Sequence, residues 1–185
     1  MEAALQTGFV PVEDYLAGEE TSDVRHEYLG GLVYAMAGET RVHNTIALNL
    51  ALAIRQHLRS GPCKLYLSDI RVNLNLRDDA CYYYPDLVVT CDPRDTDPRF
   101  VRYPKLIIEV LSPGTERVDK REKFFAYTTI ESLEEYVLVS QSPPEAMVYR
   151  RAEGWRAVKA NGFEATVALE SLSAEVPLAA VYEGL

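Results

Sequence analysis

Hydrophobic residues at helical spacing mark the clearest element of the chain. Between residues 41 and 58 the apolar positions recur every fourth residue, at Val42, Ile46, Leu50, Ile54 and Leu58. This spacing predicts an amphipathic helix that covers one face of a sheet and ends near a Gly-Pro pair. A shorter helix is predicted after Pro11, in VEDYLAG, because proline suits the first turn of a helix.

The remaining apolar runs predict strands that alternate with a second helix. The segment HEYLGGLVYAMAG has the pattern of a hairpin that turns at its Gly-Gly pair. Further strands are predicted near residues 64–68, 69–76, 82–90 and 105–112, with a turn at Asp78-Asp79, and together they are expected to form the core sheet. A helix is expected from Thr115 or Glu116 to Thr129, then a buried strand in EEYVLVS and three short strands that form a meander at the edge of the sheet. The pattern indicates an α/β fold.

Composition and length agree with one globular domain. The chain has 185 residues, of which 48% are hydrophobic and 25% charged, and no internal repeat is visible. We expect a single domain over residues 1–185, with a core at about 10–140 and short strands at 141–185. The three cysteines form no CxxC pair and are expected to be reduced thiols. No secretory signal and no membrane span are apparent, so a cytoplasmic protein without a membrane partner is expected.

The net charge of −9 argues against a generally basic, nucleic-acid-coating protein. Residues 99–123 are an exception, because they hold seven basic residues against four acidic ones. This stretch is the best candidate for phosphate contacts, although a solvated positive face would have the same composition.

Two carboxylates stand where apolar residues are expected. Glu109 lies inside LIIEVL and Asp86 inside YYYPDLVV. A buried carboxylate either becomes neutral or keeps its charge beside a cation. If the two strands pair antiparallel, both side chains project from one face, and Mg²⁺ or Mn²⁺ would relieve their repulsion. In the alternative interpretation, Asp86 turns the chain after Pro85 and Glu109 pairs with Arg71 or Lys123.

Residues on the predicted helices could complete such a site. Asp119, Lys123 and Tyr127 form one stripe at spacings of four residues, so Lys123 could face the carboxylates and hold a phosphate. An ordinary surface pair between Asp119 and Lys123 would have the same spacing. Glu27 and His43 could also reach the site, as a third carboxylate and a ligand, or could be a solvated strand residue and a packing histidine.

The order of these segments resembles a known family of nucleases. The segments RHEYLGGLVYAMAG, YYYPDLVV, PKLIIEVLSPGT, DKREKFFAY and EEYVLV, with His43 between the first two, occur as in the Uma-type restriction endonuclease family. That family is a branch of the PD-(D/E)XK nuclease superfamily, and the resemblance covers about residues 10–140. It implies a restriction endonuclease-like mixed β-sheet flanked by helices.

The resemblance also implies roles for individual residues. Asp86 and Glu109 would be the metal ligands, with the carbonyl of Val110 as a further ligand and Glu27 as the acid supplied from upstream. The superfamily pattern would place its lysine at position 111, where this chain has leucine. The following helix would then supply the lysine, which points to Lys123, with Lys105 and Lys120 as the other candidates. His43 and Asp119 would support the site.

Two functions of different classes follow. In the first, a water activated by Mg²⁺ on Asp86 and Glu109 attacks a DNA phosphodiester while Lys123 stabilises the developing charge, in a protein that could be a homodimer. In the second, the protein is a catalytically inactive binding or interaction protein that retains the nuclease fold, which the acidic charge and Leu111 favour. The sequence contains no motif that reads base edges, so it predicts no recognition sequence.

Overall fold

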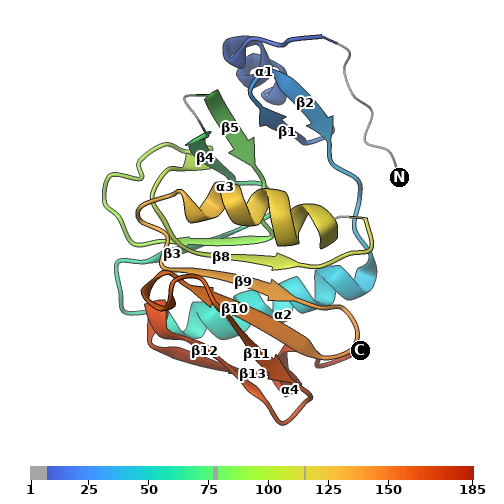
Figure 1. The fold of residues 1–185 in the computed structure, drawn as a ribbon, viewed down its shortest axis with the longest axis vertical. Helices are drawn as coiled ribbons and strands as arrows, with labels where there is room; N and C mark the ends of the chain where they lie inside the picture. Colours follow the sequence, from blue (N-terminus) through green and yellow to red (C-terminus); the bar gives the residue numbers. More distant parts are fainter. Residues whose placement is uncertain (1–7, 77–78, 115) are drawn as a thin grey trace.

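The protein is a mixed α/β molecule in which two sheets carry most of the chain (Figure 1). The computed structural model describes residues 8–76, 79–114 and 116–185. Figure 1 shows the N-terminal helix and hairpin at one end of the molecule and the C-terminal strands at the other. None of the helices in these ranges is both long and apolar enough to cross a membrane.

The larger sheet has six strands in the order β11-β10-β9-β8-β6-β3. Its strands are β3 (Lys64–Leu67), β6 (Leu87–Thr90), β8 (Pro104–Val110), β9 (Glu135–Val139), β10 (Glu145–Arg150) and β11 (Ala157–Asn161). The central pair β8 and β9 is parallel and the other pairs are antiparallel. Every residue of β6 and β9 is buried, as expected for strands covered on both faces.

The second sheet has five strands in the order β2-β1-β5-β4-β7. Its strands are β1 (His26–Leu29), β2 (Leu32–Ala35), β4 (Arg71–Leu76), β5 (Asp79–Tyr83) and β7 (Phe100–Val101). The predicted hairpin is confirmed as β1 and β2, with Gly30 and Gly31 at φ of 51° and 96° in its turn. Glycine tolerates these positive φ values because it has no Cβ. A third sheet pairs β12 (Thr166–Leu169) with β13 (Ala174–Pro177).

Helices cover both faces of the larger sheet. The predicted helices are α1 (Val12–Glu19), α2 (Arg41–His57) and α3 (Phe124–Thr128), to which the structure adds α4 (Leu178–Val181). A π-helical segment, η1 (Val118–Lys123), leads directly into α3, and short 3₁₀ turns lie at Arg151–Glu153 and Glu170–Leu172. In Figure 1, α3 crosses in front of the sheet and α2 runs behind it.

The alternation of side chains along β8 separates two hydrophobic cores. Ile108 packs with Ile46 and Ile54 of α2, whereas Ile107 packs with Tyr127 of α3. Successive strand residues point to opposite faces, so Glu109 shares the α3 face with Ile107. The sheet therefore brings Glu109 under the helix that contains Lys123.

One predicted strand is in fact two strands of different sheets. The segment at 82–90 was expected to be continuous, but β5 ends at Tyr83 and β6 begins at Leu87. Pro85 cannot donate a ladder hydrogen bond, which explains the break. The prediction of a single core sheet was also wrong, because β4 and β5 belong to the second sheet. Of the turn predicted at Asp78-Asp79, Asp78 lies outside the described residues and Asp79 begins β5.

The prediction of three reduced thiols was also wrong. Cys63 and Cys91 form a disulfide with a Cα–Cα distance of 4.0 Å, and Cys81 is free and buried. Lys64 of β3 pairs with Thr90 of β6, so the two cysteines directly flank a cross-strand pair. Sequence spacing alone does not show this proximity, because 28 residues separate the cysteines.

Candidate active site

Strand pairing brings Asp86 and Glu109 together. Leu87 pairs with Ile108 across the antiparallel strands β6 and β8, so the next positions outward are Asp86 and Glu109. The N–H of Asp86 donates to Oε2 of Glu109 at 3.2 Å. The Oδ2 atom of Asp86 accepts from the N–H of Val110 at 2.7 Å. The predicted antiparallel pairing is therefore confirmed, and three of the proposed ligand residues are direct neighbours.

Lys123 places its ammonium among three carboxylates. Its Nζ lies 3.0 Å from Oε1 of Glu27 and 3.1 Å from Oε1 of Glu109. The third acid is Asp119, whose Oδ1 is 3.4 Å from the same Nζ. Since the Lys123 side chain is only 7% exposed, these carboxylates replace the water that would otherwise solvate the charge. Of the two interpretations of Asp119 and Lys123, the structure contradicts the surface pair.

The segment η1–α3 keeps the predicted stripe of side chains on one face. Asp119, Lys123 and Tyr127 are all buried although the first two lie in a π-helical turn. The hydroxyl of Tyr127 donates to Oε1 of Glu109 at 3.3 Å. The ring of Tyr83 lies 5.6 Å from Nζ of Lys123, within the range of a cation–π contact. The lysine is thus fixed from several sides.

His43 reaches the site from the first turn of α2. Thr40 caps this helix, because its Oγ1 accepts from the N–H of His43 at 3.1 Å. The Nε2 atom of His43 lies 3.1 Å from Oδ2 of Asp86. Burial alone would lower the pKa of His43, but the hydrogen bond to Asp86 and the charge of that carboxylate raise it above its usual value. His43 therefore acts on Asp86 as a positioning and charge-balancing neighbour.

The cluster holds more carboxyl groups than basic side chains. Burial raises the pKa of Glu109 well above its usual value; Lys123 partly offsets this, while the neighbouring carboxylates raise it further. Burial alone would lower the pKa of Lys123, yet Glu109 and Glu27 raise it well above its usual value, so the amine remains an ammonium. One ammonium faces the carboxylates of Glu27, Glu109 and Asp119, with Asp86 beside them. A further cation beside Glu109 would favour its ionised form, which burial and the neighbouring carboxylates disfavour.

The donor set suits a hard divalent cation. Mg²⁺ commonly takes one or two carboxylates and completes its shell with water and phosphate oxygens. Asp86 and Glu27 keep 17% and 14% of their side chains exposed, so the cluster has an open side. Within residues 8–76, 79–114 and 116–185, no group of three or more His, Cys, Asp and Glu side chains is arranged to hold a metal ion. The adjacent carboxylates of Asp86 and Glu109 are the oxygen donors that would hold such an ion.

Other predicted candidates lie away from the cluster. Lys105 pairs with Glu134 at 3.1 Å, and Lys120 pairs with Glu116 on the exposed side of the helix. Arg71, an alternative partner for Glu109, lies instead beside the rings of Tyr15 in α1 and Tyr82 in β5. Leu111 is buried in the core next to α3. Lys123 is therefore the lysine that the fold brings to Glu109.

Two contributions to the site were missed in the sequence. The N–H of Tyr84 donates to Oε1 of Glu27 at 3.3 Å and so fixes the upstream acid. Tyr84 lies directly before the Pro-Asp pair, which is the one hint that its backbone is near. The cap Thr40 positions His43, and it could have been found as a threonine before the predicted helix.

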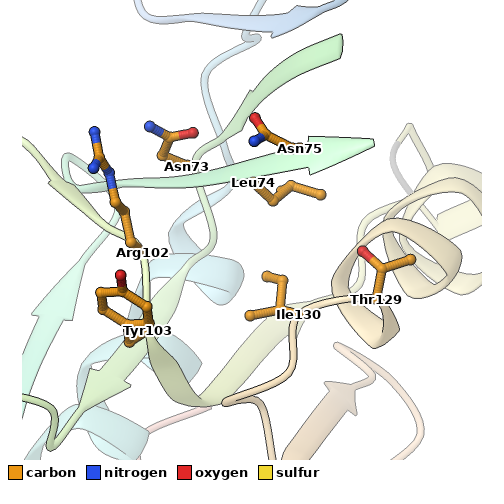
Figure 2. Close-up of a pocket in the computed structure, with 7 residues that line it drawn as sticks. All are labelled: Asn73, Leu74, Asn75, Arg102, Tyr103, Thr129 and Ile130. Carbon is orange, nitrogen blue, oxygen red and sulfur yellow. The ribbon is translucent and has the colours of Figure 1, made fainter. Parts of the chain in front are cut away.

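A separate hollow lies between β4 and the end of α3 (Figure 2). It has a volume of about 410 Å³. The hollow is lined by Asn73, Leu74, Asn75, Arg102, Tyr103, Thr129 and Ile130. Figure 2 shows Leu74 and Ile130 projecting toward each other across it. None of the predicted site residues lines this hollow.

The mixed sheet flanked by helices is the fold of restriction endonuclease-like nucleases, as the sequence predicts. The chain belongs to the Uma2 family, whose description is "Putative restriction endonuclease" and whose model matches residues 12–180. The match covers nearly the whole chain, including the C-terminal strands.

Similar proteins support the same family and fold. The protein slr1290 of Synechocystis sp., named only as uncharacterized, is 36% identical over 177 residues, which cover 94% of this chain and 91% of that protein. A second Synechocystis protein, sll1609, also named uncharacterized, is 32% identical over 144 residues, covering 76% and 80%. A crystal structure from Anabaena variabilis, titled a "putative nuclease belonging to DUF820", matches with a TM-score of 0.76 at 15% identity. It covers 94% of this chain and 97% of its own, and shows a shared fold.

Proposed function

We propose that this protein is a metal-dependent endonuclease that hydrolyses DNA phosphodiester bonds. The observation that carries the proposal is the contact of Asp86 with Glu109, next to an ammonium held by Glu109 and Glu27. Membership of the Uma2 family supports a nuclease. Paired carboxylates beside a fixed cation suit phosphoryl chemistry, in which catalysis rests on positioning and on stabilising negative charge.

The metal would be held by Asp86, Glu109 and the carbonyl of Val110. Mg²⁺ or Mn²⁺ is the ion expected, because these ions prefer hard oxygen ligands. When bound, such an ion polarises a phosphate oxygen and lowers the pKa of a coordinated water.

The surrounding residues prepare the site for a phosphate. Lys123 presents a permanent ammonium that would donate hydrogen bonds to a phosphate oxygen as negative charge builds up. Glu27 and Asp119 keep this ammonium protonated and in place. His43 and the N–H of Val110 fix the Asp86 carboxylate, so that its orientation does not depend on the substrate.

A catalytically inactive binding or interaction protein is the second candidate. The observation that favours it is the direct ion pair between Lys123 and Glu109, which already compensates the buried carboxylate without a metal. The net charge of −9 also disfavours contact with DNA over a large surface. Cytoplasmic location and a homodimer stay predictions.

Cleavage of supercoiled plasmid separates the two candidates. With Mg²⁺ or Mn²⁺ the wild-type protein should nick the plasmid, and EDTA should stop the reaction. Asp86→Asn and Glu109→Gln should each reduce the rate by about 100-fold or more while the circular dichroism spectrum stays unchanged. Glu134→Gln is the matched control, because Glu134 is an exposed acid that pairs with Lys105 at the start of β8. Wild-type rates in both site variants would contradict the proposal.

A further inference from the structure

A second polar cavity lies next to the candidate active site. It has a volume of about 360 Å³, and Glu19, Arg25, Asp69, Arg71, Tyr84 and Arg99 are among its lining residues. Three of these six side chains are guanidinium groups. A cavity of this size admits a phosphate group with part of its attached sugar.

Arg71 is the unusual residue of this cavity. The residue is 4% exposed, and its Nη1 atom has no hydrogen-bond partner in the described part of the chain. The rings of Tyr15, Tyr82 and Tyr84 lie 5.6 to 5.9 Å from its Cζ atom. Cation–π contacts offset part of the cost of burying this charge, and the Tyr15 hydroxyl hydrogen-bonds the guanidinium, but neither gives Nη1 an acceptor. A buried guanidinium nitrogen without an acceptor indicates that an acceptor is supplied by a ligand.

The acids of the cavity are already occupied by other groups. Asp69 pairs with Arg25 at 3.2 Å, and Glu20 pairs with Arg99. All four side chains are more than 40% exposed, and exposed ion pairs of this kind contribute only about 0–1 kcal/mol. Both arginines could therefore turn to an incoming anion at little cost.

The remaining buried acid of the cavity is held by its own donors. Glu19 accepts from the hydroxyl of Tyr84 and the N–H of His26, at 2.7 and 3.3 Å. Its other oxygen, Oε1, lies 2.7 Å from Nδ1 of His26. Among the described residues, Arg71 is thus left without a carboxylate partner, although acids line the same cavity.

Tyr84 connects the cavity with the candidate active site. Its side chain lines the cavity, while its N–H donates to Glu27, and Asp86 follows two residues later. Arg25 directly precedes β1, and Glu27 is the second residue of that strand. A strand of nucleic acid with one phosphate at Asp86 and Glu109 would have a neighbouring phosphate within reach of this cavity.

We propose that this cavity binds a phosphate group through Arg71, with Arg25 and Arg99 closing on it from the rim. The expected source is a backbone phosphate of the DNA that flanks the cleaved bond, which rests on the proposed function. A planar guanidinium offers two parallel N–H groups to a phosphate and suits this role better than an ammonium.

Thermal unfolding with inorganic phosphate tests the site without DNA. At constant ionic strength, phosphate should raise the Tm of the wild-type protein and of Arg59→Gln, an exposed arginine beyond the C-terminal end of α2. The Tm of Arg71→Gln should not respond. Without phosphate, Arg71→Gln should be at least as stable as wild type, since it removes an unpaired buried charge. If Arg71 is merely structural, Arg71→Gln should instead have a lower Tm than the wild type, and phosphate should leave the wild-type Tm unchanged.

DNA binding identifies the source of the phosphate. In a Glu109→Gln background without divalent metal, Arg71→Gln should weaken binding of a fluorescent duplex about tenfold. It should also reduce the slope of log K against log salt by about 0.9, the value for one lost phosphate contact. Arg71→Lys keeps the charge in case Arg71→Gln does not fold, and should give an intermediate loss.

The outcomes separate this inference from the proposed function. A phosphate response that depends on Arg71, with unchanged DNA binding, supports the site and assigns it to free phosphate. Responses independent of Arg71 in both experiments overturn the inference, even if the wild-type protein cleaves plasmid. A response that depends on Arg71 in a protein that cleaves no DNA supports the site and contradicts the nuclease.

Discussion

At the scale of single residues, the site is organised around the ammonium of Lys123. It is buried and contacts Glu27, Glu109 and Asp119 at 3.0 to 3.4 Å. A lysine loses its hydration when buried, and the carboxylates compensate for that loss only while all partners are present. The residue therefore has a structural role as well as the proposed catalytic one.

Removal of this ammonium should destabilise the fold. Lys123→Met keeps the volume but leaves the buried carboxylates of Glu109 and Asp119 without their cation, so we expect the free energy of unfolding to fall by about 3–5 kcal/mol. Urea titration measures this change. Lys120→Met on the same helix, which breaks an exposed pair with Glu116, should change it by less than about 1 kcal/mol.

Divalent metal should compensate for part of this loss. Mg²⁺ that binds the folded carboxylates stabilises the native state in proportion to its occupancy, so it should raise the unfolding free energy of Lys123→Met more than that of wild type. Equal gains for both proteins would show that removal of the ammonium does not strengthen metal binding at these acids.

The cysteines give a prediction about reactivity. Burial raises the pKa of the Cys81 thiol to about 12, so almost no thiolate exists at pH 8. Cys63 and Cys91 are joined in a disulfide. A thiol-reactive dye should label no cysteine of the folded, non-reduced protein, and only Cys81 after unfolding in denaturant. Labelling of Cys63 or Cys91 without a reductant would contradict the disulfide.

At the scale of elements, the sequence predicted those with a strong local pattern. The helix α2 follows from its apolar repeat, and the hairpin β1–β2 from its Gly-Gly turn. β5 and β6 belong to different sheets because the strand is interrupted at Pro85, which cannot donate a ladder hydrogen bond. Which sheet receives each strand is decided by long-range packing, which local periodicity does not contain.

The candidate site shows the same division. The pairing of β6 with β8 places Asp86 beside Glu109, and the stripe on η1–α3 brings Lys123 to Glu109, as the spacing predicts. The contact of His43 with Asp86 joins residues 43 positions apart, and the sequence left open whether His43 reaches the site or packs elsewhere. The Nη1 atom of Arg71, buried without an acceptor among the described residues, could not be predicted, because this is a property of the packed molecule.

The cap of α2 offers a test of how an element positions a site residue. Thr40→Ala removes the acceptor for the N–H of His43 and should cost about 1 kcal/mol in unfolding free energy, whereas Thr40→Ser should retain most of it. The same loss of order should weaken metal binding in Thr40→Ala, because His43 holds Asp86. If the alanine and serine variants are equally stable, the cap contributes nothing.

At the scale of the whole molecule, the C-terminal segment completes the core behind the sheet. Val167, Val176 and Val181 pack in the same cluster as Ile46 and Leu50 of α2. The first two predicted C-terminal strands extend the sheet as β10 and β11, whereas the third, β12, pairs with β13 in a sheet of its own. The segment is therefore structurally necessary although it contributes no residue to the candidate site.

Truncation should reveal this dependence. Deletion of residues 141–185 would expose the apolar face of α2 and remove Arg150, which pairs with the buried Glu135 at 2.9 Å. We expect a protein without a cooperative thermal transition. Deletion of the exposed residues 184–185 alone should leave a single transition close to that of wild type. A stable, cooperative product from residues 1–140 would contradict this account.

The central claim is that the acidic cluster around Asp86 and Glu109 binds a divalent cation. Calorimetric titration with Mn²⁺ tests it most directly, because it does not depend on the choice of DNA. The wild-type protein and Glu134→Gln should bind about one ion per chain, whereas Asp86→Asn and Glu109→Gln should lose this binding while remaining folded. Wild-type protein that takes up no Mn²⁺ at millimolar concentration, or takes it up equally after Asp86→Asn, would contradict the account.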